Sequence, residues 1–232
     1  MKEEDFIQDI EKAEKDVEHE DHFHKKDRKH HLIYAIVALL MLSMFVLWYI
    51  PADSIKLDPE PKNIPSLESL YFNVEMTNET HLDVQNPYEY RLLLTPSDPA
   101  IKSIADRIVV ESCSGDERVC YAKALFYFVR DEFDYVNDPL AFEYVKSAKE
   151  SLVAKGGDCD DASVLLASLL RAVGFNTRFV FIPGHVYVQV SIPESVQKYK
   201  QEQDWINVDA TCKNCAFGEV PFQSNKAEKM YV

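Results

Sequence analysis

The order of the predicted elements indicates an α+β fold. Two helix patterns come first, over residues 98–111 and 116–133, and strand patterns follow at 177–182, 185–192 and 205–211. Helices that precede a group of antiparallel strands, rather than alternating with single strands, are typical of α+β proteins. The composition is 47% hydrophobic and 12% aromatic, which is enough for a packed core in one domain of ordinary size.

The first fifty residues contain a charged tail and an apolar segment. Residues 1–31 are rich in Glu, Asp, Lys and His; a His-rich tract can bind metal, but a solvated cytoplasmic tail is the expected structure. Residues 32–50 carry no formal charge and are long enough to cross a bilayer core of about 30 Å. The apolar region of a cleaved signal peptide is shorter, so we expect one uncleaved transmembrane helix. Basic residues at 25–29 precede it, which places the N-terminus in the cytoplasm and the rest of the chain outside the cell membrane.

The region between the apolar segment and the first helix pattern is predicted to be a stalk and N-terminal extension, residues 51–97. Four prolines lie within residues 51–65, as in extended linkers. Residues 90–94 have a strand-like composition, and Asn78 begins a glycosylation sequon that is usable only outside the cell. The catalytic domain is expected to occupy residues 98–232.

The charge balance argues against one class of partner. The formal net charge is −14 and no basic stripe is visible, so nucleic acid is not expected to bind. Acidity of this kind usually reflects a solvated surface.

The second half of the chain contains a helix pattern that begins at a cysteine. Gly156-Gly157 is predicted to form a tight turn, which places Cys159 in the first turn of a helix that ends near Gly174. Apolar positions 162, 165, 166, 169 and 173 define one buried face. A helix N-terminus lowers a thiol pKa, but three aspartates beside Cys159 oppose that effect, so a thiolate there requires a cationic partner.

Such a partner is predicted on the strands that follow. The patterns at 177–182 and 185–192 flank a Pro-Gly turn, so His185 opens the return strand of a hairpin. Asp209 lies near the end of the strand pattern at 205–211. Both side chains alternate with Val and Ile neighbours, so adjacent pairing of the two strands brings them together. The thiol joins them only if the cysteine helix packs against the His185 face of its strand.

These residues resemble the transglutaminase-like superfamily. The resemblance comprises a Gly-Asp-Cys helix start at Cys159, His185 on a strand 26 positions later, and Trp-x-x-x-Asp-x-Thr around Asp209. It extends from about residue 105 to residue 221, includes an aromatic segment at 132–135, and is closest to short membrane-anchored archaeal members. It implies a papain-like core, in which a helical part carrying the cysteine packs on an antiparallel sheet carrying the histidine and the aspartate.

The resemblance also implies a function. Cys159, His185 and Asp209 are expected to form a catalytic triad of a thiol acyltransferase that acts on protein or peptide amides through a thioester, without a required cofactor. The same triad with water as the acceptor gives a thiol peptidase or amidase, and a non-catalytic peptide-binding or scaffold module is a third possibility. Tyr135 and Trp205 are weaker candidates for the substrate pocket.

The number of cysteines supports one free nucleophile. The chain has five cysteines, and setting Cys159 aside leaves two close pairs, Cys113 with Cys120 and Cys212 with Cys215. Disulfides fit the expected location outside the cell. A structural zinc site made by all four thiolates is the alternative, since Cys-x₂-Cys is an acceptable spacing for zinc ligands; the x₆ spacing of the first pair is less usual, so disulfides are favoured.

Overall fold

The structure is a computed structural model that describes Lys12 and residues 30–49, 58–70, 84, 86–115, 117–138 and 144–232, with only the backbone of Phe222. The chain divides into two compact units, Met1–Ser54 and Ile55–Val232. Most of the charged tail and the predicted sequon at Asn78 lie outside the described residues.

The first unit contains one helix, His30–Tyr49, within its described residues. Its mean hydropathy of 2.3 and its length are sufficient to cross a membrane. A signal sequence near an N-terminus meets the same criteria. The helix is therefore a candidate membrane span, and its bounds agree closely with the predicted transmembrane segment, residues 32–50.

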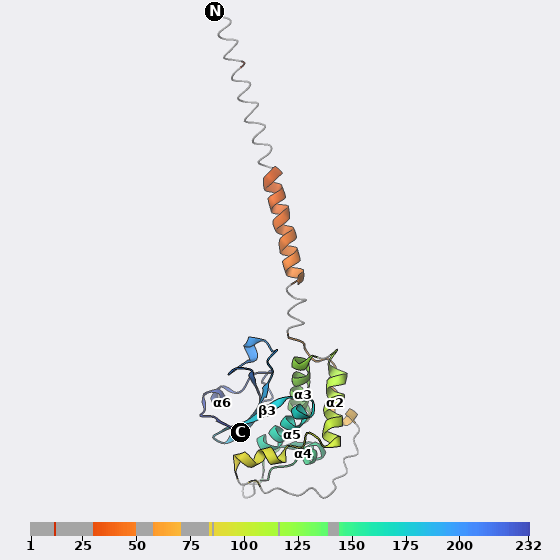
Figure 1. Cartoon of the computed structure of the whole chain (residues 1–232), viewed down its shortest axis with the longest axis vertical. Coiled ribbons are helices and arrows are strands. Elements are labelled where there is room, and N and C mark those ends of the chain that lie inside the picture. The colour runs from red at the N-terminus through yellow and green to blue at the C-terminus, as the bar shows by residue number, and fades with distance from the viewer. Residues whose placement is uncertain are drawn as a thin grey trace, which may run out of the picture. The chain divides into compact units, whose positions relative to one another are not determined.

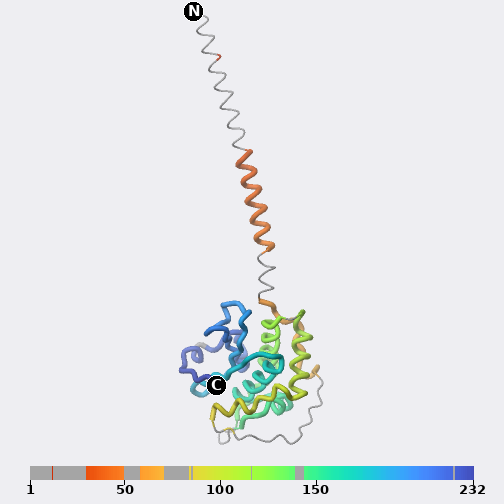
Figure 2. Tube along the Cα trace, viewed as in Figure 1, coloured from red at the N-terminus to blue at the C-terminus, as the bar shows by residue number. Residues whose placement is uncertain are grey.

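The second unit confirms the α+β prediction. Figure 1 shows helices α2, α3, α4 and α5 grouped together, with β3 and α6 beside them, and the Cα trace in Figure 2 shows the same division between the green helices and the blue C-terminal part. The described elements are, in order, η1 (Leu67–Leu70), η2 (Pro87–Leu93), α2 (Pro99–Ser112), α3 (Arg118–Glu132), β1 (Asp134–Tyr135), α4 (Ala148–Ala154), β2 (Gly156–Gly157), α5 (Cys159–Ala172), β3 (Asn176–Ile182), β4 (His185–Ser191), η3 (Gln197–Tyr199), β5 (Trp205–Val208), α6 (Phe222–Lys226) and β6 (Met230–Tyr231).

The segment before α2 differs from its prediction. Residues 90–94 were expected to be strand-like, but residues Pro87–Leu93 form the 3-10 helix η2. The Asn86 side chain accepts a hydrogen bond from the Tyr88 N–H at 3.1 Å, and Pro87 supplies a fixed φ at the first helical position. These local start signals outweigh the strand propensity of the Tyr and Leu residues that follow.

Helix α5 is the central element of the unit. Asp158 accepts hydrogen bonds from the N–H groups of Asp160 and Asp161, and the Asp161 side chain accepts one from the Asp158 N–H, which completes a capping box. Every residue from Asp160 to Leu170 is buried. The prediction of a single buried face was therefore too narrow, because α2, α3 and α4 cover the helix together with strands β3 and β4.

The principal sheet has the strand order β5-β4-β3-β6, with all of its pairs antiparallel. Ile182 pairs with His185 across the Pro183-Gly184 turn, as the hairpin prediction required. Val188 pairs with Val208, so continuing that register places Asp209 diagonally across from His185 on the same face.

The cysteine helix does not pack on the His185 face of β4, which corrects the predicted condition for closing the triad. Val186, Val188 and Val190 join the hydrophobic core together with the apolar residues of α5, and Ser163 of α5 donates a hydrogen bond to the Val186 carbonyl at 3.2 Å. His185 is the first residue of β4, where the strand begins beside the N-terminus of α5. At a strand end both faces are reachable, so the alternation of side chains does not separate the imidazole from the thiol.

The two glycines before Cys159 form strand β2 rather than the predicted tight turn. They pair in parallel with β1, Asp134 with Gly156 and Tyr135 with Gly157, and neither has a positive φ. A Cβ atom on Gly156 would lie 2.9 Å from the Asp134 carbonyl oxygen, and one on Gly157 would overlap the Asp161 side chain. Glycine is required at these two positions because other atoms approach the backbone closely, and not because the chain turns there.

Gly157→Ala is therefore expected to destabilise the unit by about 1–3 kcal/mol, the range for overpacking a filled site. At an unstrained position with open space the same change would instead stabilise by about 0.4–1 kcal/mol through the unfolded chain. Urea unfolding of the wild type and the variant measures the sign of the effect. An unchanged or raised midpoint would show that Asp161 moves aside without loss.

A buried ion cluster fixes the start of the second unit to α3. Lys123, whose side chain is 0% exposed, donates to Asp58 and Glu60 at 2.6 Å each. Asp58 also accepts from Lys198 and Tyr199. Burial raises the pKa of Asp58, but the hydrogen bonds from these three side chains outweigh it and leave the pKa below its usual value. Residues 58–60, expected to belong to an extended stalk, are thus part of the folded unit.

Candidate active site

His185 and Asp209 form a hydrogen-bonded pair. His185 Nε2 lies 2.9 Å from Asp209 Oδ2, and Asp209 is only 2% exposed. The other carboxylate oxygen, Oδ1, accepts from the N–H of Thr211 at 3.1 Å and from its hydroxyl at 2.7 Å. A carboxylate only accepts hydrogen bonds, so Nε2 carries a proton and Nδ1 of the neutral ring is free to accept one.

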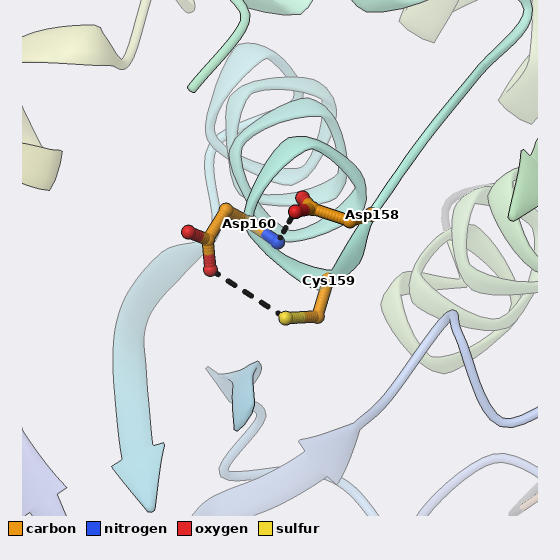
Figure 3. Close-up of side chains that lie close together, drawn as sticks. All are labelled: Asp158, Cys159 and Asp160. Atoms are coloured by element: carbon orange, nitrogen blue, oxygen red, sulfur yellow. Dashed lines mark hydrogen bonds between the residues drawn. The ribbon is translucent and has the colours of Figure 1, made fainter. Parts of the chain in front are cut away.

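Cys159 is the only one of the five cysteines, all of them described, that lies outside a disulfide. It is the first residue of α5, and its sulfur lies 3.6 Å from Asp160 Oδ1 (Figure 3). Burial, together with the charges of Asp160 and Asp158, raises the pKa of the thiol to about 12, while the Val186 N–H acts in the opposite direction. In this arrangement the thiol is protonated at neutral pH.

Cys159 and His185 line one cavity of about 380 Å³. The helix start supplies Cys159 and the two neighbouring aspartates, and the β3–β4 hairpin supplies the histidine side. The described residues that line the cavity are Val84, Asn86, Pro87, Tyr90, Asp158, Cys159, Asp160, Phe181, Ile182, Gly184, His185 and Val186. The structure therefore brings the predicted thiol and imidazole to one cavity and the predicted carboxylate into contact with the imidazole.

One wall of this cavity comes from a segment that sequence reasoning did not connect with the site. Asn86, Pro87 and Tyr90 belong to η2 and its cap. The Tyr90 hydroxyl donates to Asp160 Oδ2 at 2.6 Å, across 70 positions of sequence. The Asn-Pro dipeptide marks a helix start, but nothing in the sequence indicates which part of the fold that helix contacts.

The two weaker pocket candidates lie outside the described lining of the cavity. Tyr135 is 49% exposed; burial and the negative charges of Cys159, Asp158, Asp160 and Asp209 raise its pKa, which shows that it is near the site. Trp205 begins β5, at the opposite end of that strand from Asp209. The guanidinium of Arg178 lies 4.3 Å from the centre of its ring.

The four remaining cysteines form two disulfides, Cys113–Cys120 and Cys212–Cys215. The first joins the end of α2 to the start of α3, and the second follows Asp209 closely in sequence. All four sulfurs are thereby used, which favours the disulfide prediction over the four-thiolate zinc site.

Three consecutive side chains, Asp158, Cys159 and Asp160, present possible ligand atoms within 4.8 Å of one another. Asp158 is engaged in capping α5, and Asp160 is engaged with Tyr90, so we assign no metal site to them.

Burial and the charges of Asp160 and Asp161 raise the pKa of Asp158 to about 6. Asp161, fully buried, accepts from the Lys146 side chain at 2.5 Å and from its backbone N–H at 2.7 Å, which supports the helix start.

Comparison with known proteins gives one family and several distant structures. No curated protein matches the chain. A protein from Cytophaga hutchinsonii, provisionally described as a cysteine protease, is similar over 63% of this chain at 18% identity and a TM-score of 0.41; the chain spans only about half of it, 47%. LapG of Legionella pneumophila, in its calcium-bound form, is similar over 56% of this chain and 79% of its own length, at 18% identity and a TM-score of 0.35. The sequence profile of the transglutaminase-like superfamily matches residues 102–210, which include Cys159, His185 and Asp209. These residues, a little under half of the chain, therefore resemble the transglutaminase-like superfamily.

Proposed function

We propose that this chain is a membrane-anchored thiol acyltransferase that acts on protein or peptide amides through Cys159, His185 and Asp209. The observation that carries the proposal is the cavity that a free cysteine shares with a histidine whose Nε2 is held by a buried carboxylate. The superfamily of the domain supports cysteine chemistry of this kind. Protein or peptide substrates, and the absence of a nucleic-acid partner, belong to the same proposal.

In the proposed mechanism the thiol proton passes to His185 Nδ1, and the thiolate attacks the carbonyl carbon of an amide. The C–N bond then breaks, the imidazolium gives its proton to the departing nitrogen, and a thioester with Cys159 remains. His185 next removes a proton from the acceptor, which attacks the thioester and releases the sulfur. Asp209 keeps the imidazole in the required tautomer and stabilises its charged form.

The helix start supplies a group that can stabilise the tetrahedral intermediate. Cys159 is the first helical residue, so its N–H has no acceptor within the helix. An N–H group that points to the developing oxyanion lowers the barrier, typically by about 3–4 kcal/mol for each donor.

The nature of the acceptor distinguishes the leading proposal from its main alternative. The full chain in detergent is incubated with a glutamine-containing peptide, with and without a primary amine, and the products are weighed by mass spectrometry. We expect the amine to take the place of the NH₂ group of the glutamine side chain, which leaves as ammonia. Formation of the hydrolysed product alone, even with the amine present, would indicate a hydrolase with the same three residues, and an unchanged peptide under all conditions would favour a non-catalytic binding module.

We further propose that the chain is a single-pass protein of the cell membrane, with a cytoplasmic N-terminus and an extracytoplasmic catalytic domain. The apolar helix His30–Tyr49 and the basic residues before it support this topology. The two disulfides support an oxidising location for the domain. Protease digestion of intact cells is expected to remove the domain; protection until the cells are lysed would overturn the topology.

A further inference from the structure

The Cys159 thiol donates its hydrogen bond to the carboxylate of Asp160. Its sulfur is within 3.6 Å of Asp160 Oδ1, and the other oxygen of the same carboxylate accepts from the Tyr90 hydroxyl at 2.6 Å. Asp160 is 9% exposed and Tyr90 is 8% exposed, so solvent screens this chain of hydrogen bonds weakly. Tyr90–Asp160–Cys159 therefore forms a continuous polar path from η2 to the sulfur.

Burial of the sulfur and the groups around it decide how readily it ionises. Asp158 and Asp160 add negative charge from the start of α5, and Tyr135 on β1 is close enough to interact with the sulfur's charge. On β4 the Val186 N–H favours the thiolate, and His185 lines the same cavity. Asp160 is the charged group in hydrogen-bond contact with the sulfur, so it opposes thiolate formation most directly.

We propose that Tyr90 and Asp160 hold Cys159 in a resting, protonated state, and that Tyr90 is a positioning residue which sets the reactivity of the nucleophile. This inference rests on the proposed function of Cys159. The phenol stabilises the charged carboxylate in a place with little water and fixes its orientation, which directs Oδ1 toward the sulfur. Ionisation then requires the thiol to leave Asp160 and give its proton to His185.

In this arrangement, a segment that lies outside the residues matched by the family profile is part of the active site. The superfamily profile matches residues 102–210, whereas Tyr90 belongs to η2 in the preceding extension. Tyr90 also packs edge-on against Phe181, with ring centres 4.9 Å apart, which ties η2 to the hairpin that carries His185. The extension thus contacts both sides of the cavity.

The test is the pH dependence of alkylation of the full chain in detergent by iodoacetamide, without reductant. The other four cysteines are in disulfides, so Cys159 is the thiol that reacts. In Asp160→Asn we expect a rate about three- to thirtyfold higher at pH 7.5, and a profile moved to lower pH. A like charge at contact raises a pKa by about 1–3 units, so its removal increases the thiolate fraction by about the same number of log units. About half of that increase, on the logarithmic scale, is offset by the lower nucleophilicity of a more acidic thiol.

Tyr90→Phe is expected to shift the profile in the same direction by a smaller amount. Without the phenol, the carboxylate loses the hydrogen bond that fixes its orientation, so it can turn away from the sulfur and its effect on the sulfur weakens. Asp106→Asn makes the same change in net charge as Asp160→Asn, but on an exposed part of α2, and should leave the profile unchanged. This control separates a local effect from a change in overall charge.

The outcomes distinguish the inference from the proposed function. If wild-type Cys159 reacts and neither Asp160→Asn nor Tyr90→Phe moves the profile to lower pH, the resting-state inference is wrong and the proposed function stands. If Cys159 reacts in neither the wild type nor Asp160→Asn at any pH up to about 10, above the usual thiol value of about 8.5, while the unfolded chain does react, the proposed nucleophile fails as well. Circular dichroism of each variant shows whether it is folded.

Discussion

Cys159→Ala is expected to abolish acyl transfer and hydrolysis while leaving the domain folded. Removing the nucleophile of a triad in another enzyme lowers kcat by about 10⁶-fold, so we expect a loss of at least about 10³-fold, to the detection limit. The helix start does not depend on the thiol, because the side chains of Asp158 and Asp161 form the capping box. Amine incorporation followed by mass spectrometry measures the activity, and urea unfolding should give a stability within about 1 kcal/mol of the wild type.

Two further variants make this result specific to the thiol. Cys159→Ser keeps the size and polarity of the side chain but not its acidity, so it should be nearly as inactive as the alanine variant. Asp106→Asn, on the exposed part of α2, should remain fully active. Retention of amine incorporation by folded Cys159→Ala would place the nucleophile elsewhere in the chain and end the proposal.

The parts of the fold that follow from local signals were predictable from the sequence. Asp98 caps α2 by accepting from the N–H groups of Ala100 and Ile101, and the Pro-Gly turn places His185 at the start of β4. Both depend on residues within a few positions of one another. The start of η2 shows the limit of such signals: Asn86 and Pro87 carry one too, but the strand-like composition after them gave the wrong prediction.

What could not be predicted depends on contacts between distant parts of the chain. Glycine tolerates both turns and close packing, and only the approach of Asp134 and Asp161 shows that Gly156 and Gly157 serve the second purpose. Lys123 reads as an exposed helix residue until its partners, 63 and 65 positions away, are known.

The candidate site also has one part that was predictable from the sequence and one part that was not. The order and spacing of Cys159, His185 and Asp209 indicated the site because strand pairing brings the last two together, and the helix start places the first at the same cavity as His185. The contact between Tyr90 and Asp160 was missed because no periodic pattern connects η2 with α5. In our further proposal this contact helps to hold the thiol in its resting state, so a residue that sequence reasoning missed acts on the nucleophile that it found.

Asp209→Asn is expected to lower kcat by about 10³–10⁴-fold with a much smaller effect on KM, in line with the loss in a serine-protease triad after the same change. The reason lies in Thr211, whose N–H and hydroxyl both donate to Asp209 Oδ1. In the asparagine variant these donors keep the amide oxygen on their side, so the amide NH₂ group turns toward His185 Nε2. Nε2 must then accept a hydrogen bond, the ring proton moves to Nδ1, and the nitrogen intended for the thiol proton is blocked.

Steady-state amine incorporation by the full chain in detergent measures kcat and KM separately, and Thr211→Val provides the matched comparison. That change removes the hydroxyl donor but leaves the carboxylate and its bond to His185, so the tautomer is preserved and a loss of no more than about tenfold is expected, the effect of roughly one lost hydrogen bond. Combining the two changes tests the argument further, because the amide of Asp209→Asn is then less firmly oriented and part of the lost rate should return. Equal activity of Asp209→Asn and the wild type would mean that the imidazole does not need the carboxylate, and Asp209 would lose its assigned role in fixing the tautomer of His185.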